Sequence, residues 1–304
     1  MIIDTDAGFD DFIAMELLKN RSVQFISIVP GIQNQPSRAT NFFQKQFPQA
    51  TVMTSSKKGE PAGEGWLIEY RENLNRFMEG EAKTNDNNDV EHSDSTAMIQ
   101  EFLSMQPDSD PIDLMCLGPL TNIAQWVTDD KVGVLLQQKV KNVWIMGGNI
   151  PSKTSTDEPK IEPEFNFALD PIAANKVFTS PYIADKIVVL PAQTCTDVAP
   201  DNEIWKRIMH LSQSRNGIIS RILKVEKDYG HIKYDPLCSY AYTHPNNIKC
   251  ERLNVEVDCS NGLVSFKEDS NNKVIKFVTH ADHYGDDGFL SWVCKAVEAE
   301  PLEN

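Results

Sequence analysis

Short runs of apolar residues alternate with helix-like patterns along the first two-thirds of the chain. The short runs are typical of buried strands, and apolar residues at helical spacing between them are typical of helices that cover a sheet. This alternation indicates β-α-β units and a parallel sheet with helices on both faces. The strands that it predicts span residues 1–3, 23–29, 50–53, 112–116, 143–146 and 187–190.

Helices are predicted between these strands, where apolar residues recur every three to four positions. The pattern marks one helix shortly after the first strand, a second in the region of residues 66–77, and a third before the strand at 112–116. The apolar positions are Phe12, Met15, Leu17 and Leu18 in the first helix, Trp66, Ile68, Tyr70, Leu74 and Phe77 in the second, and Met98, Ile99, Phe102 and Leu103 in the third.

The pattern changes after Pro200, where it is helical at first. Residues 252–257 and 262–267 then alternate as a β-hairpin around a Ser-Asn-Gly turn, residues 273–278 indicate a further strand, and residues 287–298 indicate a final helix. We therefore predict a single α/β domain over residues 1–304, with a mostly parallel central sheet wrapped by helices and a C-terminal β-hairpin and helix.

Two stretches interrupt this order and are expected to be exposed loops. Residues 79–94 are acidic and rich in Asn, and residues 147–163 are rich in Pro, Ser, Thr and Lys. Loops this long inside a compact domain are often functional lids, but a plain surface excursion explains them equally well.

The charge of the chain narrows the classes of ligand. With 44 acidic and 29 basic residues the formal net charge is -15, and a field of that sign repels nucleic-acid phosphates and anionic membrane surfaces. Neutral or cationic small molecules are the expected partners. The six cysteines are scattered without a CxxC pair, which argues against a disulfide framework or a zinc site. The N-terminal residues lack a signal-peptide pattern and no apolar run approaches the length of a membrane helix, so we expect a cytoplasmic protein.

The most informative segment is the acidic turn after the first strand. Asp4, Asp6, Asp10 and Asp11 lie within eight residues, at the place where ligands bind in open α/β sheets, and Gly8 lets the backbone turn there. Capping of the following helix explains one or two of these carboxylates. The remaining carboxylates would repel one another at such close range unless a cation neutralises their charge. Because all of the available ligand atoms are oxygens, the expected cation is Ca²⁺ or Mg²⁺.

Two chemistries use such a turn. One is phosphoryl transfer of the haloacid dehalogenase type, in which an Asp-x-Asp supplies an aspartyl nucleophile, and Asp4-Thr5-Asp6 superficially resembles it. That family normally has Thr or Val where Gly8 stands. The other is metal-assisted hydrolysis, in which a cation lowers the pKa of a water that a neighbouring carboxylate deprotonates.

The turn resembles the N-terminal signature of the nucleoside hydrolase family, Asp-x-Asp-Pro-Gly-x-Asp-Asp. All specified positions match except that Ala7 replaces the proline, a change expected to cost turn rigidity rather than a ligand. Further segments match in order and span most of the chain, and the family fold agrees with the predicted sheet. These segments are Leu-Gly-Pro-Leu-Thr-Asn-Ile-Ala at 117–124, Met-Gly-Gly at 146–148, Glu-Phe-Asn at 164–166 with Asp-Pro-Ile-Ala-Ala at 170–174, and Asp-Pro-Leu at 235–237.

The resemblance implies a Ca²⁺ site and an activity. Asp6 would bind calcium and activate the attacking water, Asp11 and Asp235 would be further ligands, and Leu117 would give its backbone carbonyl. The implied reaction is hydrolysis of the N-glycosidic bond of a ribonucleoside, with inversion, and nearby carboxylates suit its oxocarbenium-like transition state. The residues implied to hold the ribose and line the pocket are Asp10, Glu164, Asn166 and Met146.

The leaving-group side departs from the family pattern. Tyr234 stands where many members have a His that protonates the departing base, and His231 is the nearest substitute. On the ribose loop Glu158 stands where a second Asn is often found, so Asn149 is a candidate replacement, and Ile32 stands where the family usually shows Asn. The sequence therefore leaves open a catalytically silent ribosyl-binding homologue and, less favoured, a Mg²⁺ phosphatase. Relatives are commonly homodimers or homotetramers, so the resemblance implies a homodimer or homotetramer for this chain as well.

Overall fold

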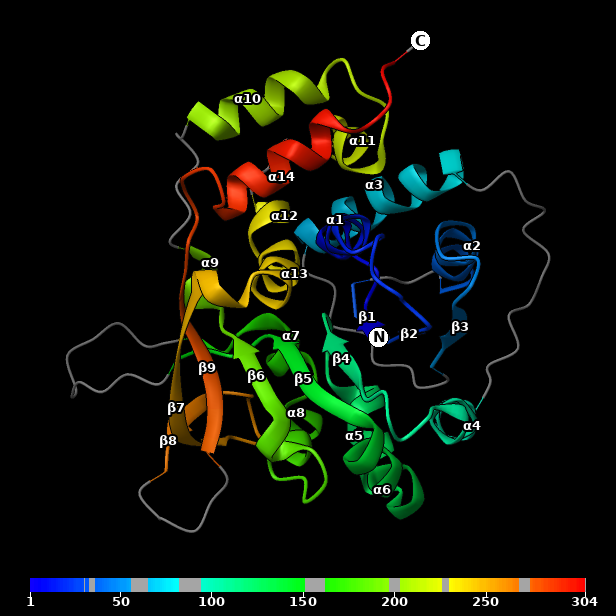
Figure 1. The fold of residues 1–304 in the computed structure, drawn as a ribbon, viewed down its shortest axis with the longest axis vertical. Helices are drawn as coiled ribbons and strands as arrows, with labels where there is room; N and C mark the ends of the chain where they lie inside the picture. Colours follow the sequence, from blue (N-terminus) through cyan, green and yellow to red (C-terminus); the bar gives the residue numbers. More distant parts are fainter. Residues whose placement is uncertain are drawn as a thin grey trace.

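The computed structural model describes residues 1–29, 31–32, 36–55, 65–81, 94–150, 162–196, 203–225, 230–267 and 274–303. The strands of these segments form one sheet in the order β3-β2-β1-β4-β5-β6-β9-β7-β8 (Figure 1). Neighbours from β3 to β9 pair in parallel, and β7 is antiparallel to both β9 and β8. The strands are β1 Ile2–Thr5, β2 Phe25–Ile28, β3 Thr51–Thr54, β4 Ile112–Cys116, β5 Val140–Met146, β6 Ile187–Leu190, β7 Ile248–Val257, β8 Val264–Phe266 and β9 Val274–Ala281.

Helices cover both faces of the sheet, because alternate residues of each strand point to opposite sides. Ile3 of β1 belongs to one apolar core and Ile2 to the other. The first core holds α1, α2, α3 and α9 to α14, and the second holds α4 to α8. The helices are α1 Phe9–Leu17, α2 Pro36–Gln46, α3 Gly65–Glu81, α4 Ser95–Met105, α5 Thr121–Thr128, α6 Asp130–Lys139, α7 Phe165–Leu169, α8 Pro171–Phe178, α9 Ala192–Thr196, α10 Glu203–Ser212, α11 Ile218–Val225, α12 Gly230–Lys233, α13 Asp235–Thr243 and α14 Phe289–Glu298.

The mostly parallel sheet and the C-terminal hairpin and helix confirm the predicted fold class. Each of the six predicted N-terminal strands is present, and β5 begins three residues before the predicted start. The hairpin is β7 and β8, whose turn contains Gly262 at φ 83°. The predicted strand at 273–278 is β9, which inserts between β6 and β7 in the sheet. Within the described segments, no helix is both long and apolar enough to cross a membrane.

The two predicted loops are described only at their ends. Residues 79–81 belong to α3, and Asp94 caps α4 through hydrogen bonds from the backbone of Thr96 and Ala97. Residues 147–150 and 162–163 are described, whereas 82–93 and 151–161 lie outside the described residues. The prediction that these loops act as lids therefore stays a prediction.

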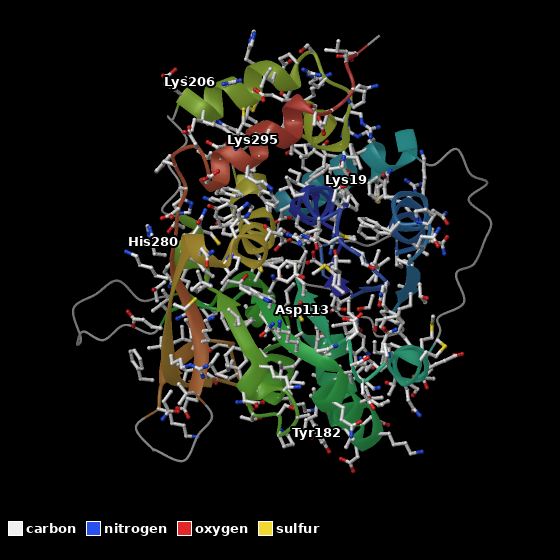
Figure 2. The ribbon with its side chains drawn as sticks, in the orientation of Figure 1. Lys19, Asp113, Tyr182, Lys206, His280 and Lys295 are labelled. Carbon is white, nitrogen blue, oxygen red and sulfur yellow. The ribbon has the colours of Figure 1, made fainter. Side chains whose placement is uncertain are left out.

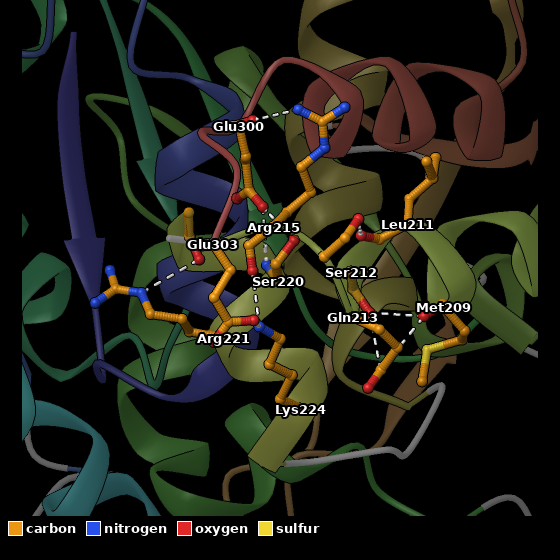
Figure 3. Close-up of polar contacts among 12 residues, drawn as sticks. Met209, Leu211, Ser212, Gln213, Arg215, Ser220, Arg221, Lys224, Glu300 and Glu303 are labelled. Atoms are coloured by element: carbon orange, nitrogen blue, oxygen red, sulfur yellow. Dashed lines mark hydrogen bonds and ion pairs between the residues drawn. The ribbon is translucent and has the colours of Figure 1, made fainter.

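The C-terminal segment is fastened to the helical layer formed by α10, α11 and α14. The Glu300 carboxylate accepts hydrogen bonds from the backbone nitrogens of Ile219 (2.8 Å) and Ser220 (3.1 Å) and from the Ser220 hydroxyl, so it caps α11 from outside that helix (Figure 3). Arg215 donates to the Glu300 carbonyl at 2.8 Å. Charged side chains such as Lys206 and Lys295 lie on the outer surface of this layer (Figure 2).

The position of β1 in the sheet decides where a site can form. β1 lies between β2 and β4 in the sheet. After β1 the chain adds β2 and then β3 on one side of β1, and it then crosses over to add β4 on the other side. Crevices at the carboxyl ends of strands form where the strand order reverses in this way. The segments that follow β1, β2, β4 and β5 therefore meet at one edge of the sheet.

Candidate active site

A cavity of about 570 Å³ opens at this edge. Its walls come from the segments after β1, β2, β4 and β5 and from α3, α7, α9, α12 and α13. The sequence-predicted residues that line it are Asp6, Asp10, Asp11, Leu117, Met146, Asn149, Glu164, Asn166, Tyr234 and Asp235. His231 belongs to α12, but its side chain lies outside the described residues.

The turn after β1 is held by its own side chains. The Thr5 hydroxyl donates to Asp11 and accepts from the backbone nitrogen of Ala7 at 3.0 Å, and the backbone nitrogen of Gly8 donates to Asp11 at 2.9 Å. Ala7 adopts φ 58°, a left-handed conformation that proline, with φ fixed near −65°, cannot reach. Ala7 therefore changes the backbone path of the turn as well as its rigidity.

Three carboxylates converge from distant parts of the chain. Asp10, Asp11 and Asp235 each offer an oxygen within 4.8 Å of the others, an arrangement that could hold a metal ion. Asp235 begins α13, and the Ser239 hydroxyl of that helix donates to the Ala14 carbonyl of α1 at 3.3 Å. The packing of α13 on α1 thus brings Asp235 to the acidic turn.

Asp6 adjoins this trio instead of belonging to it. The Asp6 carboxylate is electrostatically coupled to that of Asp11, and the backbone nitrogen of Ile32 donates to Asp6 at 3.2 Å. The sequence had assigned Asp6, Asp11 and Asp235 to the metal and Asp10 to the ribose. In the structure all four carboxylates face one cavity, with Asp10 inside the closest set.

Burial and mutual repulsion destabilise the ionised form of the carboxylates in this cluster. Burial raises the pKa of Asp6 to about 6, and burial together with the charges of neighbouring aspartates raises the pKa of Asp11 and of Asp235 well above the usual range. Within the described part of the chain, neither Asp11 nor Asp235 forms an ion pair with Lys or Arg. Protons or a cation must therefore neutralise the excess negative charge.

The loop after β2 fixes Asp6 from the other side. A Cβ atom at Gly31 would lie 2.5 Å from Oδ2 and 2.7 Å from Cβ of Asp6, so the backbone of Gly31 packs directly on this carboxylate. Arg71 of α3 donates to the carbonyls of Ile32 (2.7 Å) and Gly31 (3.1 Å). Ile32, which departs from the family Asn, thus contributes its backbone to the position of Asp6.

Glu164 and Asn166 organise the wall between β4 and β5. The Glu164 carboxylate caps α7, accepting from the backbone nitrogens of Asn166 (2.9 Å), Gly148 (2.9 Å) and Phe167 (3.2 Å), and burial raises its pKa to about 6. The Asn166 amide nitrogen lies 3.4 Å from the carbonyls of both Leu117 and Met146. The Leu117 carbonyl is therefore at the cavity wall beside Asn166.

Asn149 lines the cavity and is also hydrogen-bonded to the backbone of β8. Its amide nitrogen donates to the Val264 carbonyl at 3.3 Å, and its amide oxygen accepts from the Val264 backbone nitrogen at 3.2 Å. Both polar groups of the side chain are thereby used to fasten the loop after β5 to β8. Its amide keeps a second hydrogen and a second lone pair, so a role of Asn149 as a replacement ribose ligand stays a prediction.

Two lining residues were missed by the sequence analysis. Tyr70, assigned only to the apolar face of a helix, accepts from the backbone nitrogen of Phe9 at 2.8 Å and so covers the first turn of α1. Lys233 is the only cationic side chain among the described residues that line the cavity. Its place directly before Tyr234 was visible in the sequence, but nothing in the pattern indicated that it faces the site.

Comparison with known proteins decides the family. A model of the inosine-uridine preferring nucleoside hydrolase family matches residues 1–285. The chain belongs to this family. The family is therefore the one that the acidic turn and the later segments resembled, and membership makes the protein an N-glycosyl hydrolase acting on ribonucleosides.

Curated relatives and solved structures agree with the assignment. The chain is 26% identical over 281 residues to the pyrimidine-specific ribonucleoside hydrolase RihB of Shigella flexneri serotype 5b (strain 8401), covering 86% of this chain and 84% of the relative. Its fold matches the inosine-uridine preferring nucleoside hydrolase of Bacillus anthracis with a TM-score of 0.74, at 17% identity and 98% coverage of both chains. It also matches an inosine-guanosine nucleoside hydrolase (TM-score 0.69, 18% identity, 98% of both chains).

A third solved structure extends the range of proteins that share this fold. The type III effector protein XopQ, solved in complex with adenosine diphosphate ribose, matches with a TM-score of 0.66 at 14% identity, over 97% of this chain and 92% of that chain. At such identity the likeness concerns the fold alone.

Proposed function

We propose that this protein is a Ca²⁺-dependent ribonucleoside hydrolase that releases free base and ribose. The observation that carries the proposal is the convergence of the Asp235 carboxylate with those of Asp10 and Asp11, beside Asp6, in a cavity of nucleoside size. Burying these carboxylates together carries an electrostatic cost, and a bound cation would remove that cost.

The donor set fits a hard cation. Asp6, Asp11, Asp235 and the carbonyl of Leu117 would hold the ion, with Asp10 close enough to contribute, and all of these donors are oxygens. Such a set suits Ca²⁺, which takes six to eight oxygen ligands in flexible geometry. A bound Ca²⁺ would supply Lewis-acid activation of the attacking water and would coordinate the ribose hydroxyls.

The protein side chains would divide the remaining work. Asp6 would accept the proton of the water that attacks C1′ from the face opposite the base, giving inversion. Asp10, Glu164 and Asn166 would orient the ribose hydroxyls, and Met146 would line the sugar pocket. The buried carboxylates would stabilise the positive charge that develops on the ribose.

The direct test is release of reducing sugar from a panel of ribonucleosides in the presence of Ca²⁺, compared with the same reactions in chelator. We expect release from at least one nucleoside and loss of activity with the chelator. No release from any nucleoside by folded, calcium-loaded protein would contradict the proposal.

Tyr234 in place of the family His supports one alternative, a silent protein that binds ribosyl compounds. This alternative predicts that titration calorimetry detects saturable binding of ribose or a nucleoside without turnover. A cytoplasmic location, a single-domain organisation and a homodimeric or homotetrameric assembly stay predictions from the sequence, and light scattering on the purified protein tests the last of them.

A further inference from the structure

Lys233 brings an isolated positive charge to an otherwise acidic cavity. It is the last residue of α12, is only partly exposed, and its ammonium lies 5.2 Å from the centre of the Tyr234 ring. Six carboxylates line the same cavity, and among the described residues none of them forms an ion pair with Lys233. Its charge is therefore available to a bound ligand.

The charges of the cavity are arranged unevenly. The carboxylates come from the turn after β1, the start of α13 and the segment before α7. The cation comes from α12 and stands with Tyr234, the residue at the leaving-group position of the family pattern. Breaking an N-glycosidic bond builds positive charge on the ribose and negative charge on the departing base, so a cavity lined by both carboxylates and a cation offers a partner to each charge of the transition state.

We propose that Lys233 stabilises the negative charge that forms on the leaving base as the C1′–N bond breaks. This inference rests on the proposed function. The bonding electrons pass to the ring nitrogen of the base, and water adds its oxygen to C1′ while Asp6 receives its proton. Lys233 donates a hydrogen bond to the base, and the base anion takes its proton from solvent after it departs.

This role selects a class of substrate. A fixed cation helps most when the departing base can spread its negative charge onto carbonyl oxygens, as uracil and hypoxanthine do. It helps little when the leaving group needs no assistance, as with p-nitrophenolate. Nucleosides whose base carries a carbonyl oxygen, such as uridine and inosine, are therefore expected to depend on Lys233, whereas adenosine, whose base has none, is expected to gain little from it.

The test compares Lys233→Met, which keeps the length of the side chain without its charge, with Lys233→Arg, which keeps the charge. Both are assayed as calcium-loaded protein with uridine and with p-nitrophenyl β-D-ribofuranoside. Removing one donor aimed at developing negative charge typically lowers kcat by about 10²-fold to 10³-fold, so we expect a loss of about 10²-fold for Lys233→Met on uridine. We expect a loss below about threefold on the nitrophenyl riboside and partial retention of uridine turnover by Lys233→Arg.

The results separate this inference from the proposed function. Wild-type protein that hydrolyses no ribonucleoside of the panel removes both the proposed function and the inference about Lys233, whereas turnover of another nucleoside without turnover of uridine removes only the inference. Wild-type protein that hydrolyses uridine, with Lys233→Met equally active or equally impaired on both substrates, overturns the role of Lys233 alone. Tighter binding of uridine 5′-monophosphate than of uridine, lost in Lys233→Met, would also overturn it by assigning the ammonium to a phosphate. An unchanged Ca²⁺ affinity of the variant by calorimetry shows that the acidic end of the cavity is intact.

Discussion

Replacing Asp235 by Asn should make the metal-free protein more stable and at the same time abolish its stabilisation by Ca²⁺. The carboxylate of Asp235 lies within 4.8 Å of those of Asp10 and Asp11. At an effective dielectric constant near 20, two unit charges at that separation repel by about 3 kcal/mol, and shared protons reduce this figure. We expect a net gain of about 2 kcal/mol, or about 4 °C in Tm at roughly 2 °C per kcal/mol.

Calcium should remove most of this difference between the two proteins. Free Ca²⁺ at one hundred times its Kd stabilises the folded wild type by about 2.7 kcal/mol, or roughly 5 °C. The Asp235→Asn variant has lost one charged ligand and should gain less than about 1 °C at the same calcium concentration.

Thermal unfolding in chelator and in a calcium series measures both effects. Asp110→Asn is the matched control, because it makes the same change of charge at an exposed position outside the cavity. This control should alter neither the metal-free Tm nor the calcium response. An Asp235→Asn variant that is less stable in chelator, yet responds to Ca²⁺ like the wild type, would refute the argument that this cluster is a cation site.

Three further perturbations test other parts of the structure. Gly31→Ala places a methyl group 2.5 Å from Oδ2 of Asp6, so the carboxylate or the loop must shift, and we expect kcat to fall about 10²-fold while far-ultraviolet circular dichroism is unchanged. Glu300→Ala removes the external cap of α11 and should lower the free energy of unfolding in urea by about 2 kcal/mol, with a smaller loss for Glu300→Gln. Burial raises the pKa of Asp4 from 3.8 to about 7, so its contribution favours the metal-free fold at low pH and is lost as pH rises. Between pH 5 and 8 the unfolding free energy in chelator should fall by about 3 kcal/mol from this residue, and Asp4→Asn should remove that part of the slope.

The part of the fold that sequence could predict is the part governed by local pattern. The predicted strands at 112–116 and 187–190 have the same bounds as β4 and β6, because nearly all of their residues are apolar and buried on both faces of the sheet. The place of β9 between β6 and β7 was not predictable, since it depends on pairing between strands that are not neighbours along the chain.

The residues of the site also differ in how far the sequence could predict them. The density of carboxylates in the turn after β1 pointed to a cation without any knowledge of the fold, whereas Asp235 entered only through the family resemblance. The pairing of the Asn149 amide with the backbone of Val264 was not predictable, because only the folded hairpin supplies that partner. Lys233 was overlooked because an isolated lysine becomes informative only when the charges around it are known.

The acidic cluster also explains why activity and folding should be linked in this protein. Asp11 and Asp235 are buried among like charges, and Thr5, Ala7 and Gly8 hold the turn in place. The carboxylates therefore cannot move apart, and their repulsion destabilises the metal-free fold. A substitution that relieves the repulsion must also remove a ligand or weaken the charge that faces the ribose. Stability of the metal-free state and affinity for the cation should therefore change in opposite directions across substitutions of these carboxylates, while substitutions at Glu300 should change stability alone.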